Sequence, residues 1–342
     1  MKAPLEQRYW QFGLLLAGAI LAPLIAPNDY VVGVLARICL YSMLALGLNI
    51  VVGFAGLLDI GYVAFFGIGS YVYAFLASPH FGIHLPFIPA MIIVVVVTGV
   101  SGIIIGAPTL RLRGDYLAIV TLGFGEITYI CLVNLDRPIN ITGGPSGLIR
   151  IDPPSLFGLS FDSNRQYYYL FLLTLGALIY ASIRLRDSRI GWAWRAIRED
   201  ELAAGAMGIN TMVSKLQAFV LGASFAGFAG GLLASWQHSV FPDNFLFQES
   251  INVLAMVILG GMGSVFGVIL GAAIIVGLPE IFRDLAIYRL LAFGALMMVL
   301  MVIRPEGLWP EHGRKKPRPP NKSPLTRSST DVSVGDRPAS ER

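Results

Sequence analysis

Apolar segments of about twenty residues, separated by short polar breaks, recur along most of the chain. A helix needs about 17 to 25 apolar residues to cross roughly 30 Å of hydrocarbon. The pattern therefore predicts an all-α integral membrane protein, a polytopic bundle of about ten transmembrane helices. The predicted spans are 12–27, 30–52, 62–77, 86–107, 116–134, 167–183, 216–236, a pair within 251–279, and 289–303.

The pair within 251–279 allows a second interpretation, because Gly260-Gly261-Met262-Gly263-Ser264 interrupts it. Non-helical backbone at membrane depth is tolerated where it lines a cavity or is buried in protein. If these segments are re-entrant, eight transmembrane helices plus re-entrant segments remain. Both alternatives give an even number of crossings, so both termini lie on the same side of the membrane.

Composition supports the membrane class and excludes a soluble domain. Hydrophobic residues make up 55% of the 342 residues and charged residues only 13%, against roughly 25% charged in an ordinary soluble domain. The interval 60–110 holds no acidic or basic residue. Cys39 and Cys131 both lie in apolar segments, where we expect them to pack as small hydrophobic side chains.

The distribution of positive charge predicts the orientation. With the N-terminus inside, the cytoplasmic segments up to residue 320 hold fifteen Lys and Arg, and the opposite side holds five. The positive-inside rule then places both termini in the cytoplasm. We expect 1–310 to form the transmembrane domain, with a cytoplasmic loop at 184–215. The segment 311–342 has too few apolar residues to fold, which predicts a disordered basic cytoplasmic tail.

No pattern typical of an enzyme is present. The four histidines are scattered, and the sequence has neither a nucleotide-binding loop nor a nucleophile elbow. We therefore expect no catalytic residue, no metal site and no cofactor bound by this chain. The sequence therefore predicts that this chain has no ATP-hydrolysing part of its own.

The cytoplasmic loop contains a compact charged segment that runs into small residues. Asp200 is a good N-cap and Glu201 falls in the first turn, so a short helix is predicted to begin there. Ala203, Ala204 and Gly208 keep this helix slim, which suits a groove on another protein. The alternative is an ordinary surface helix between two spans, and composition alone does not separate the two.

Glu126 is the clearest candidate for a contact with a transported solute. It lies near the middle of the span 116–134, where an acidic residue costs about 2.5 to 3.5 kcal/mol on insertion scales. Facing the bundle interior, it would attract a positively charged group of the solute. The alternative is a structural carboxyl group, protonated or hydrogen-bonded to Thr121 or to a neighbouring helix.

The segment 53–61 is the second candidate for the solute pathway. Its glycines permit a broken or re-entrant helix, whose exposed amides would receive a carboxylate. A tight turn with glycines for close helix packing explains the same residues equally well. The candidate pathway residues here are Gly53, Gly56, Asp59 and Gly61.

The charged segment of the loop resembles the coupling motif of ABC-importer permeases, Glu-Ala-Ala, three residues, Gly. Aligned on Gly208, the alanines fall on Ala203 and Ala204, Leu202 stands where Glu is usual, and Glu201 is one position early. The resemblance implies a helix that docks on an ATPase subunit. The residues it assigns to this coupling are Glu199, Asp200, Glu201, Leu202, Ala203, Ala204 and Gly208.

The chain as a whole, over about residues 36–310, resembles the LivM-type permeases of branched-chain amino acid importers. The blocks that carry the resemblance appear in the expected order. They include LALGLNIVVGFAGLLDIGYVAFFGIGSY, LRLRGDYLAIVTLGFGEI, ITGGPSGL, WRAIREDELAAGAMGI, VLAMVILGGMGSVFG and RPEGLWP.

This resemblance implies a permease subunit of the bacterial inner membrane that moves leucine, isoleucine or valine inward. The implied partners are a homologous permease, two ATP-binding cassette subunits that carry the ATP, and an extracytoplasmic substrate-binding protein. Two alternatives remain at this stage. One is a permease of the same family for urea or short amides, and the other is an ion-coupled secondary transporter.

Overall fold

The structure is a computed structural model that describes residues 28–79, 82–112, 114–136, 140–156, 159–161, 163–281 and 307–309, besides positions 22–23, 294 and 298. These residues belong to one compact unit, Met1–Pro310. The predicted spans 12–27 and 289–303 lie almost entirely outside the described residues. The predicted tail 311–342 lies wholly outside them.

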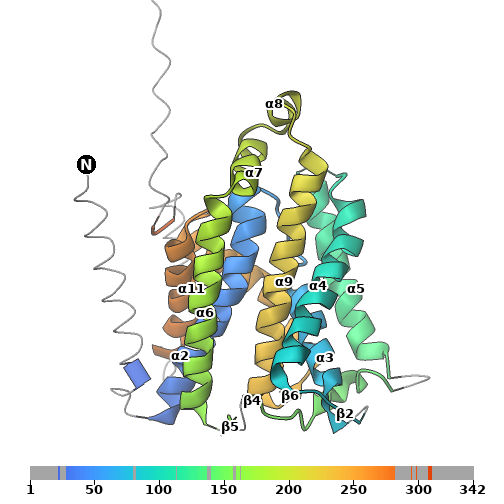
Figure 1. The fold of residues 1–342 in the computed structure, drawn as a ribbon, viewed down its shortest axis with the longest axis vertical. Coiled ribbons are helices and arrows are strands. Elements are labelled where there is room, and N and C mark those ends of the chain that lie inside the picture. The colour runs from blue at the N-terminus through green and yellow to red at the C-terminus, as the bar shows by residue number, and fades with distance from the viewer. Residues whose placement is uncertain are drawn as a thin grey trace, which may run out of the picture. The chain divides into compact units, whose positions relative to one another are not determined.

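Helices form most of the described chain (Figure 1). Five are long and apolar enough to cross a membrane: α2 with its continuation η1, and α4, α5, α6 and α9. These five confirm five of the predicted spans and make the chain a multi-pass membrane protein. The bounds are α2 Asp29–Leu48, η1 Asn49–Phe54, α3 Val63–Leu76, α4 Phe87–Thr109, α5 Asp115–Asn134, α6 Asn164–Arg186, α7 Arg189–Glu199, α8 Glu201–Ala206, α9 Thr211–Gln237, α10 Phe247–Gly260 and α11 Val265–Ile281.

Two apolar helices, α3 and α10, are shorter than the thickness of a bilayer. Each has 14 residues, which at 1.5 Å per residue is about 21 Å, less than the roughly 30 Å of hydrocarbon. Helix α11 is described over 17 residues, up to Ile281, where the described part of the chain stops. These helices correspond to the predicted span 62–77 and to the predicted pair within 251–279. The number of crossings therefore remains a prediction.

Helix α9 is the most deeply buried of the long helices. It packs against α3 on one side and α4 on another, while α2 packs against α6 and α10 against α11. Small residues recur along α9, and most of them are buried. Without a hydrophobic force between helices in lipid, small residues stabilise contacts by letting backbones approach closely.

The crossing of α3 and α9 shows this close approach directly. A Cβ atom on Gly69 would collide with the backbone of Gly227, and one on Gly230 would collide with the carbonyl oxygen of Phe66. The hydroxyl of Ser70 donates to the carbonyl of Gly230 over 2.9 Å. Glycine is therefore required here by the distance between the two backbones.

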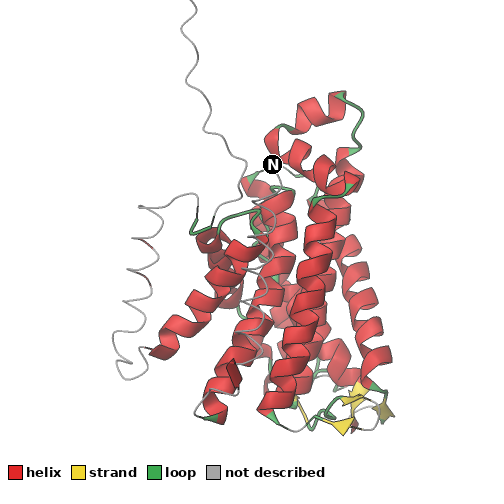
Figure 2. Ribbon diagram, turned by 60° about the vertical axis from the view of Figure 1, so that its left-hand side comes forward, coloured by secondary structure: helices red, strands yellow, loops and turns green. Residues whose placement is uncertain are grey.

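The two ends of the bundle differ in structure. Helices α7 and α8 lie at one end, and the short strands lie at the other (Figures 1 and 2). Each strand has two residues and pairs antiparallel: β1 Ala77–Ser78 with β2 Ile83–His84, β3 Leu148–Ile149 with β6 Ser239–Val240, and β4 Ser155–Leu156 with β5 Leu159–Ser160. The 3-10 turns η3 Gly144–Ser146 and η4 Pro242–Phe245 lie in the same connections.

Helix α7 was not predicted, and α4 runs past its predicted end. Three arginines lie within the eleven residues of α7, so the segment looks like a charged connection when only apolar runs long enough to span a membrane are sought. Pro108 lies inside α4, which continues to Thr109. The amide of Leu110 still donates to the carbonyl of Gly106 over 2.9 Å, so the last turn closes despite the proline.

Replacing Gly230 by valine is expected to destabilise the fold, because the new side chain would collide with the backbone of α3. Overpacking of this kind costs about 1 to 3 kcal/mol. The midpoint of thermal unfolding of the purified protein in detergent measures it. Gly176→Val on α6 is the control, since nothing lies within 4 Å of the added atom there. Equal midpoints for the two variants would contradict the packing argument.

Candidate functional site

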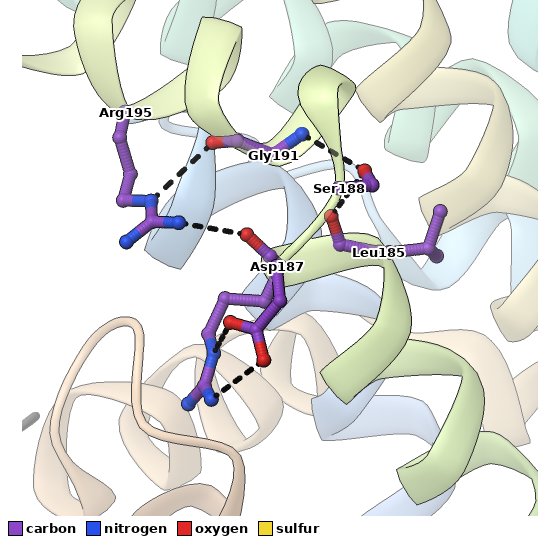
Figure 3. A network of polar contacts seen from close by, with 6 residues as sticks. Leu185, Asp187, Ser188, Gly191 and Arg195 are labelled. Atoms are coloured by element: carbon purple, nitrogen blue, oxygen red, sulfur yellow. Dashed lines mark hydrogen bonds and ion pairs between the residues drawn. The ribbon is translucent and has the colours of Figure 1, made fainter.

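A polar network fixes α7 against the end of α6 (Figure 3). Ser188 caps α7, accepting from the amide of Gly191 over 3.2 Å, and its hydroxyl donates to the carbonyl of Leu185 over 2.6 Å. The guanidinium of Arg195 donates to the carbonyl of Arg186 over 2.8 Å. The turn between α6 and α7 therefore has a defined geometry.

Trp194 fixes the other side of α7. Its side chain is fully buried, and its indole nitrogen donates to the carbonyl of Ser214 over 2.7 Å, in the first turn of α9. Ile197, one turn later, is also buried. Helix α7 is therefore held by hydrogen bonds to both α6 and α9.

Helix α8 begins where the sequence predicts it. The carboxylate of Asp200 accepts from the amides of Leu202 and Ala203 over 2.8 and 3.0 Å, which confirms the predicted N-cap. Glu201 is in the first turn, as predicted. Its carboxylate forms an ion pair of 2.6 Å with Lys215 of α9. Helix α8 is thus attached to α9 by a charged contact.

Helix α8 and the residue after it expose larger apolar side chains besides the small alanines. Leu202 is 70% exposed and Met207 84% exposed, whereas Ala204 is turned toward the rest of the chain and is buried. Ala203 and Gly208 are exposed, and so are Glu199 and Asp200 just before the helix. Met207 was not singled out from the sequence, although it directly precedes the glycine of the motif.

Gly208 ends the short helix. Its φ of +87° is in the left-handed region, which glycine adopts without strain. The amide of Ile209 then donates to the carbonyl of Ala204 over 3.1 Å, as is common where a helix ends in a left-handed residue. Nothing lies within 4 Å of a Cβ added at Gly208, so backbone conformation rather than a contact within this chain requires the glycine.

Arg198, at the end of α7, reaches the predicted break in the membrane. Its guanidinium donates to the carbonyl of Gly53, in the π-helical turn η1 that ends α2. Gly56 has a φ of +71°, and a Cβ there would lie 2.8 Å from Cγ of Arg198. Gly53 and Gly56 therefore lie against the segment that carries α8.

The same break contacts the turn between α10 and α11. The side-chain oxygen of Asn49 accepts from the amide of Gly263 over 2.9 Å in a buried contact. A Cβ on Gly53 would lie 2.6 Å from that amide. The two glycine-rich interruptions of the sequence, 53–61 and 260–264, thus meet in the structure.

Asp59 and Gly61 lie on the other side of the break, against α5. Asp59 is only 2% exposed, and one of its carboxylate oxygens accepts from the amide of Gly61 over 3.0 Å. The other oxygen is buried without a partner among the described residues. The hydroxyl of Thr121 accepts from the amide of Ile60 over 3.1 Å. These contacts hold the start of α3 close to α5.

Glu126 lies near Gly61 but not near Gly53 or Gly56. A Cβ on Gly125 would lie 3.3 Å from Cα of Gly61. Glu126 is half-buried and lines a cavity of about 10 Å³ with residues that include Ile60 and Ser250, which is room for about one water molecule. In the described chain Thr121 donates to Ala118, and no hydrogen bond to Glu126 is found. The candidate pathway residues therefore separate into two groups.

Glu249, in the first turn of α10, is an acidic residue that the sequence analysis did not single out. Its carboxylate accepts from the hydroxyl of Tyr41 over 3.3 Å and from the amide of Asn252 over 3.5 Å. Glu249 could have been identified from the sequence as an acidic residue in the first turn of an apolar helix. Unlike Glu126, this carboxylate has partners within the chain.

Comparison with known proteins assigns the chain to a family. The family described as "Branched-chain amino acid transport system / permease component" matches residues 30–304. The high-affinity branched-chain amino acid transport permease LivM of Salmonella typhimurium is 43% identical over 294 residues, covering 79% of this chain and 68% of the relative.

More distant relatives agree with this assignment. A probable LivM of Methanocaldococcus jannaschii is 27% identical over 80% of this chain and 91% of its own length. The permease LivH of Salmonella typhimurium is 24% identical over 78% of this chain and 90% of its own length. No solved structure matches the chain. With a family match over most of its length, the chain belongs to the permease components of branched-chain amino acid transport systems, which are transporter subunits and not enzymes.

Proposed function

We propose that the chain is the LivM-type permease subunit of an ABC importer that moves branched-chain amino acids inward, driven by ATP on separate subunits. The observation that carries this proposal is the short helix α8. It exposes Leu202 and Met207 at one end of the bundle and is joined through Arg198 to the helix break at Gly53. An exposed element attached to a break in the membrane domain is what a coupling helix requires.

The charges of the described residues support an orientation with α7 and α8 in the cytoplasm. Arg184, Arg186, Arg189, Arg195 and Arg198 all lie at the α7–α8 end. Arg150 and Arg165 lie in or next to the connections that carry the strands, at the other end. By the positive-inside rule the α7–α8 end is cytoplasmic, and both termini lie on that side of a bacterial inner membrane.

Coupling follows a chain of contacts in this proposal. An ATPase subunit holds α8, and its movement acts on α7, which is fixed to α6 and α9. Arg198 carries the movement to the carbonyl of Gly53. Asn49 then carries it to Gly263 and so to the α10–α11 pair. Movement of α8 thereby shifts both helix breaks together.

The second group of pathway residues supports a solute route along α5. Helix α5 buries little of its surface within this chain, and Glu126 on it is half-buried. An acidic side chain facing lipid is costly, so such residues face a bundle interior or a water-filled cavity. A homologous permease packed against α5 would enclose Glu126 between the two subunits. There the carboxylate receives the ammonium group of the substrate, and an extracytoplasmic binding protein delivers that substrate.

Gly208→Leu is expected to reduce uptake to background while the protein still inserts, because leucine disfavours the left-handed conformation that ends α8. Gly82→Leu is a matched control, since Gly82 also has a positive φ, +66°, and nothing within 4 Å of an added Cβ. Uptake by the assembled complex and copurification of the ATPase subunits are measured for both. Full uptake by the Gly208 variant would overturn the coupling assignment.

Glu126→Gln is expected to reduce uptake of leucine about tenfold or more, because a charged hydrogen bond to the ammonium group is worth about 1.5 to 3 kcal/mol. Glu249→Gln is the control, because Glu249 has hydrogen-bond partners within the chain. Its loss is expected to lower the unfolding temperature. Normal uptake combined with a lowered unfolding temperature for the Glu126 variant would assign Glu126 a structural role instead.

The energy source and the substrate are tested with the assembled complex in vesicles. Uptake of labelled leucine is expected to require ATP and to continue when the proton gradient is dissipated. Labelled urea, offered in parallel, is expected not to accumulate. Uptake that needs the proton gradient would contradict an ABC importer, and uptake of urea alone would contradict the substrate class.

A further inference from the structure

A cavity of about 190 Å³ lies between the segment that carries α8 and the helix break. Its walls come from five parts of the chain: residues 55–58 of the break, the connection before α5 with the first turn of α5, the end of α7, the start of α8, and the start of α9. It is separate from the small cavity beside Glu126, with which it shares no lining residue. Of the candidate pathway residues, Gly56 borders the larger cavity and Glu126 borders the smaller one.

The cavity is lined by both apolar and charged residues. Leu57, Leu112, Leu117 and Ile197 are among its apolar residues. Within the part of the chain that the structure describes, its charged residues are Arg198, Lys215, Glu201 and Asp115. Two cations and two anions beside an aliphatic surface are complementary to a molecule that is zwitterionic at one end and aliphatic at the other.

Lys215 indicates where an anion would bind. Its side chain is only 6% exposed, and within the described part of the chain its ammonium group has one partner, Glu201 at 2.6 Å. A lysine ammonium has three donors, and buried donors are almost always satisfied by protein or water. Since Lys215 lines the cavity, an acceptor that enters it completes the hydrogen bonding of the ammonium group.

We propose that this cavity binds a free aliphatic L-amino acid from the α7–α8 side. The carboxylate of the ligand accepts from Lys215 and Arg198, and its ammonium group donates to Asp115. The aliphatic side chain contacts Leu57 and Leu117. An engineered cavity of about 150 Å³ takes benzene, so 190 Å³ accommodates a molecule somewhat larger than benzene, which fits valine or leucine.

The position of the cavity gives such a ligand a regulatory effect. Arg198 and Glu201 belong to the coupling segment, whereas Leu57 belongs to the break. A ligand in contact with both holds them at one separation, which opposes the movement that coupling requires. The inference rests on the proposed function: the amino acid that accumulates in the cytoplasm slows its own import.

Proteoliposomes that contain the assembled complex and trapped ATP test this feedback. The initial rate of labelled leucine uptake is measured with increasing unlabelled L-leucine trapped inside. The expected result is a progressive loss of rate, which trapped 3-methylbutylamine, leucine without its carboxylate, does not cause. Uptake without any trapped leucine tests the proposed function by itself, so failure of that function is distinguishable from failure of the feedback.

Asp115→Asn tests whether this cavity is responsible. It is expected to raise the trapped leucine concentration for half-inhibition about tenfold, since a charged hydrogen bond is lost. Inhibition is expressed relative to each variant's own uptake without trapped leucine. Asp187→Asn is the matched control, because Asp187 is an exposed acid of the same end, paired with Arg186, that does not line the cavity.

Leu112→Trp provides a second test by volume. Leu112 is partly exposed at the cavity, and the larger ring is expected to fill the space and remove the inhibition. If trapped leucine inhibits wild type, Asp115→Asn and Leu112→Trp equally, the inhibition arises elsewhere and the proposal is overturned. Absence of inhibition in a complex that imports leucine overturns it as well, and so does equal inhibition by the amine.

Discussion

A break in a membrane helix is stable only if protein groups satisfy the backbone that the break releases, because lipid offers no hydrogen bonds. Here Arg198 donates to the carbonyl of Gly53, and Asn49 accepts from the amide of Gly263. Both partners come from outside the segment that they satisfy. The broken region of the bundle therefore depends on side chains from α7 and from η1.

This dependence makes the α7–α8 segment part of the membrane domain rather than an independent loop. Trp194 and Arg195 attach α7 to α9 and to the end of α6, while Lys215 attaches α8 to α9. A displacement of α8 consequently changes contacts at the break as well as at the surface.

The parts of the fold that were predictable depend on local sequence. The five long spans follow from apolar runs of sufficient length, and the start of α8 follows from the N-cap residue Asp200. The contact of Arg198 with Gly53 joins residues 145 apart, and no local pattern reveals it. In the sequence, Arg198 and Lys215 look like cations that orient the protein, because charge counting does not distinguish a solvated cation from a buried one. Helix α7 was missed for a related reason, since its buried residues Gly191, Trp194 and Ile197 lie in a short segment with three arginines.

The environment of the Glu126 carboxylate is not explained by the described residues of this chain alone. Asp59 and Glu249 have hydrogen-bond partners within the chain, so the chain itself stabilises them. Glu126 is half-buried on a helix that buries little of its surface, and lipid is an unfavourable environment for its carboxylate. Under the proposed function, a second permease subunit packed against α5 would resolve this conflict by enclosing the carboxylate in a protein-lined space. The unfavourable free energy of an acidic side chain in lipid is the physical argument for proposing that the solute route lies between two permeases.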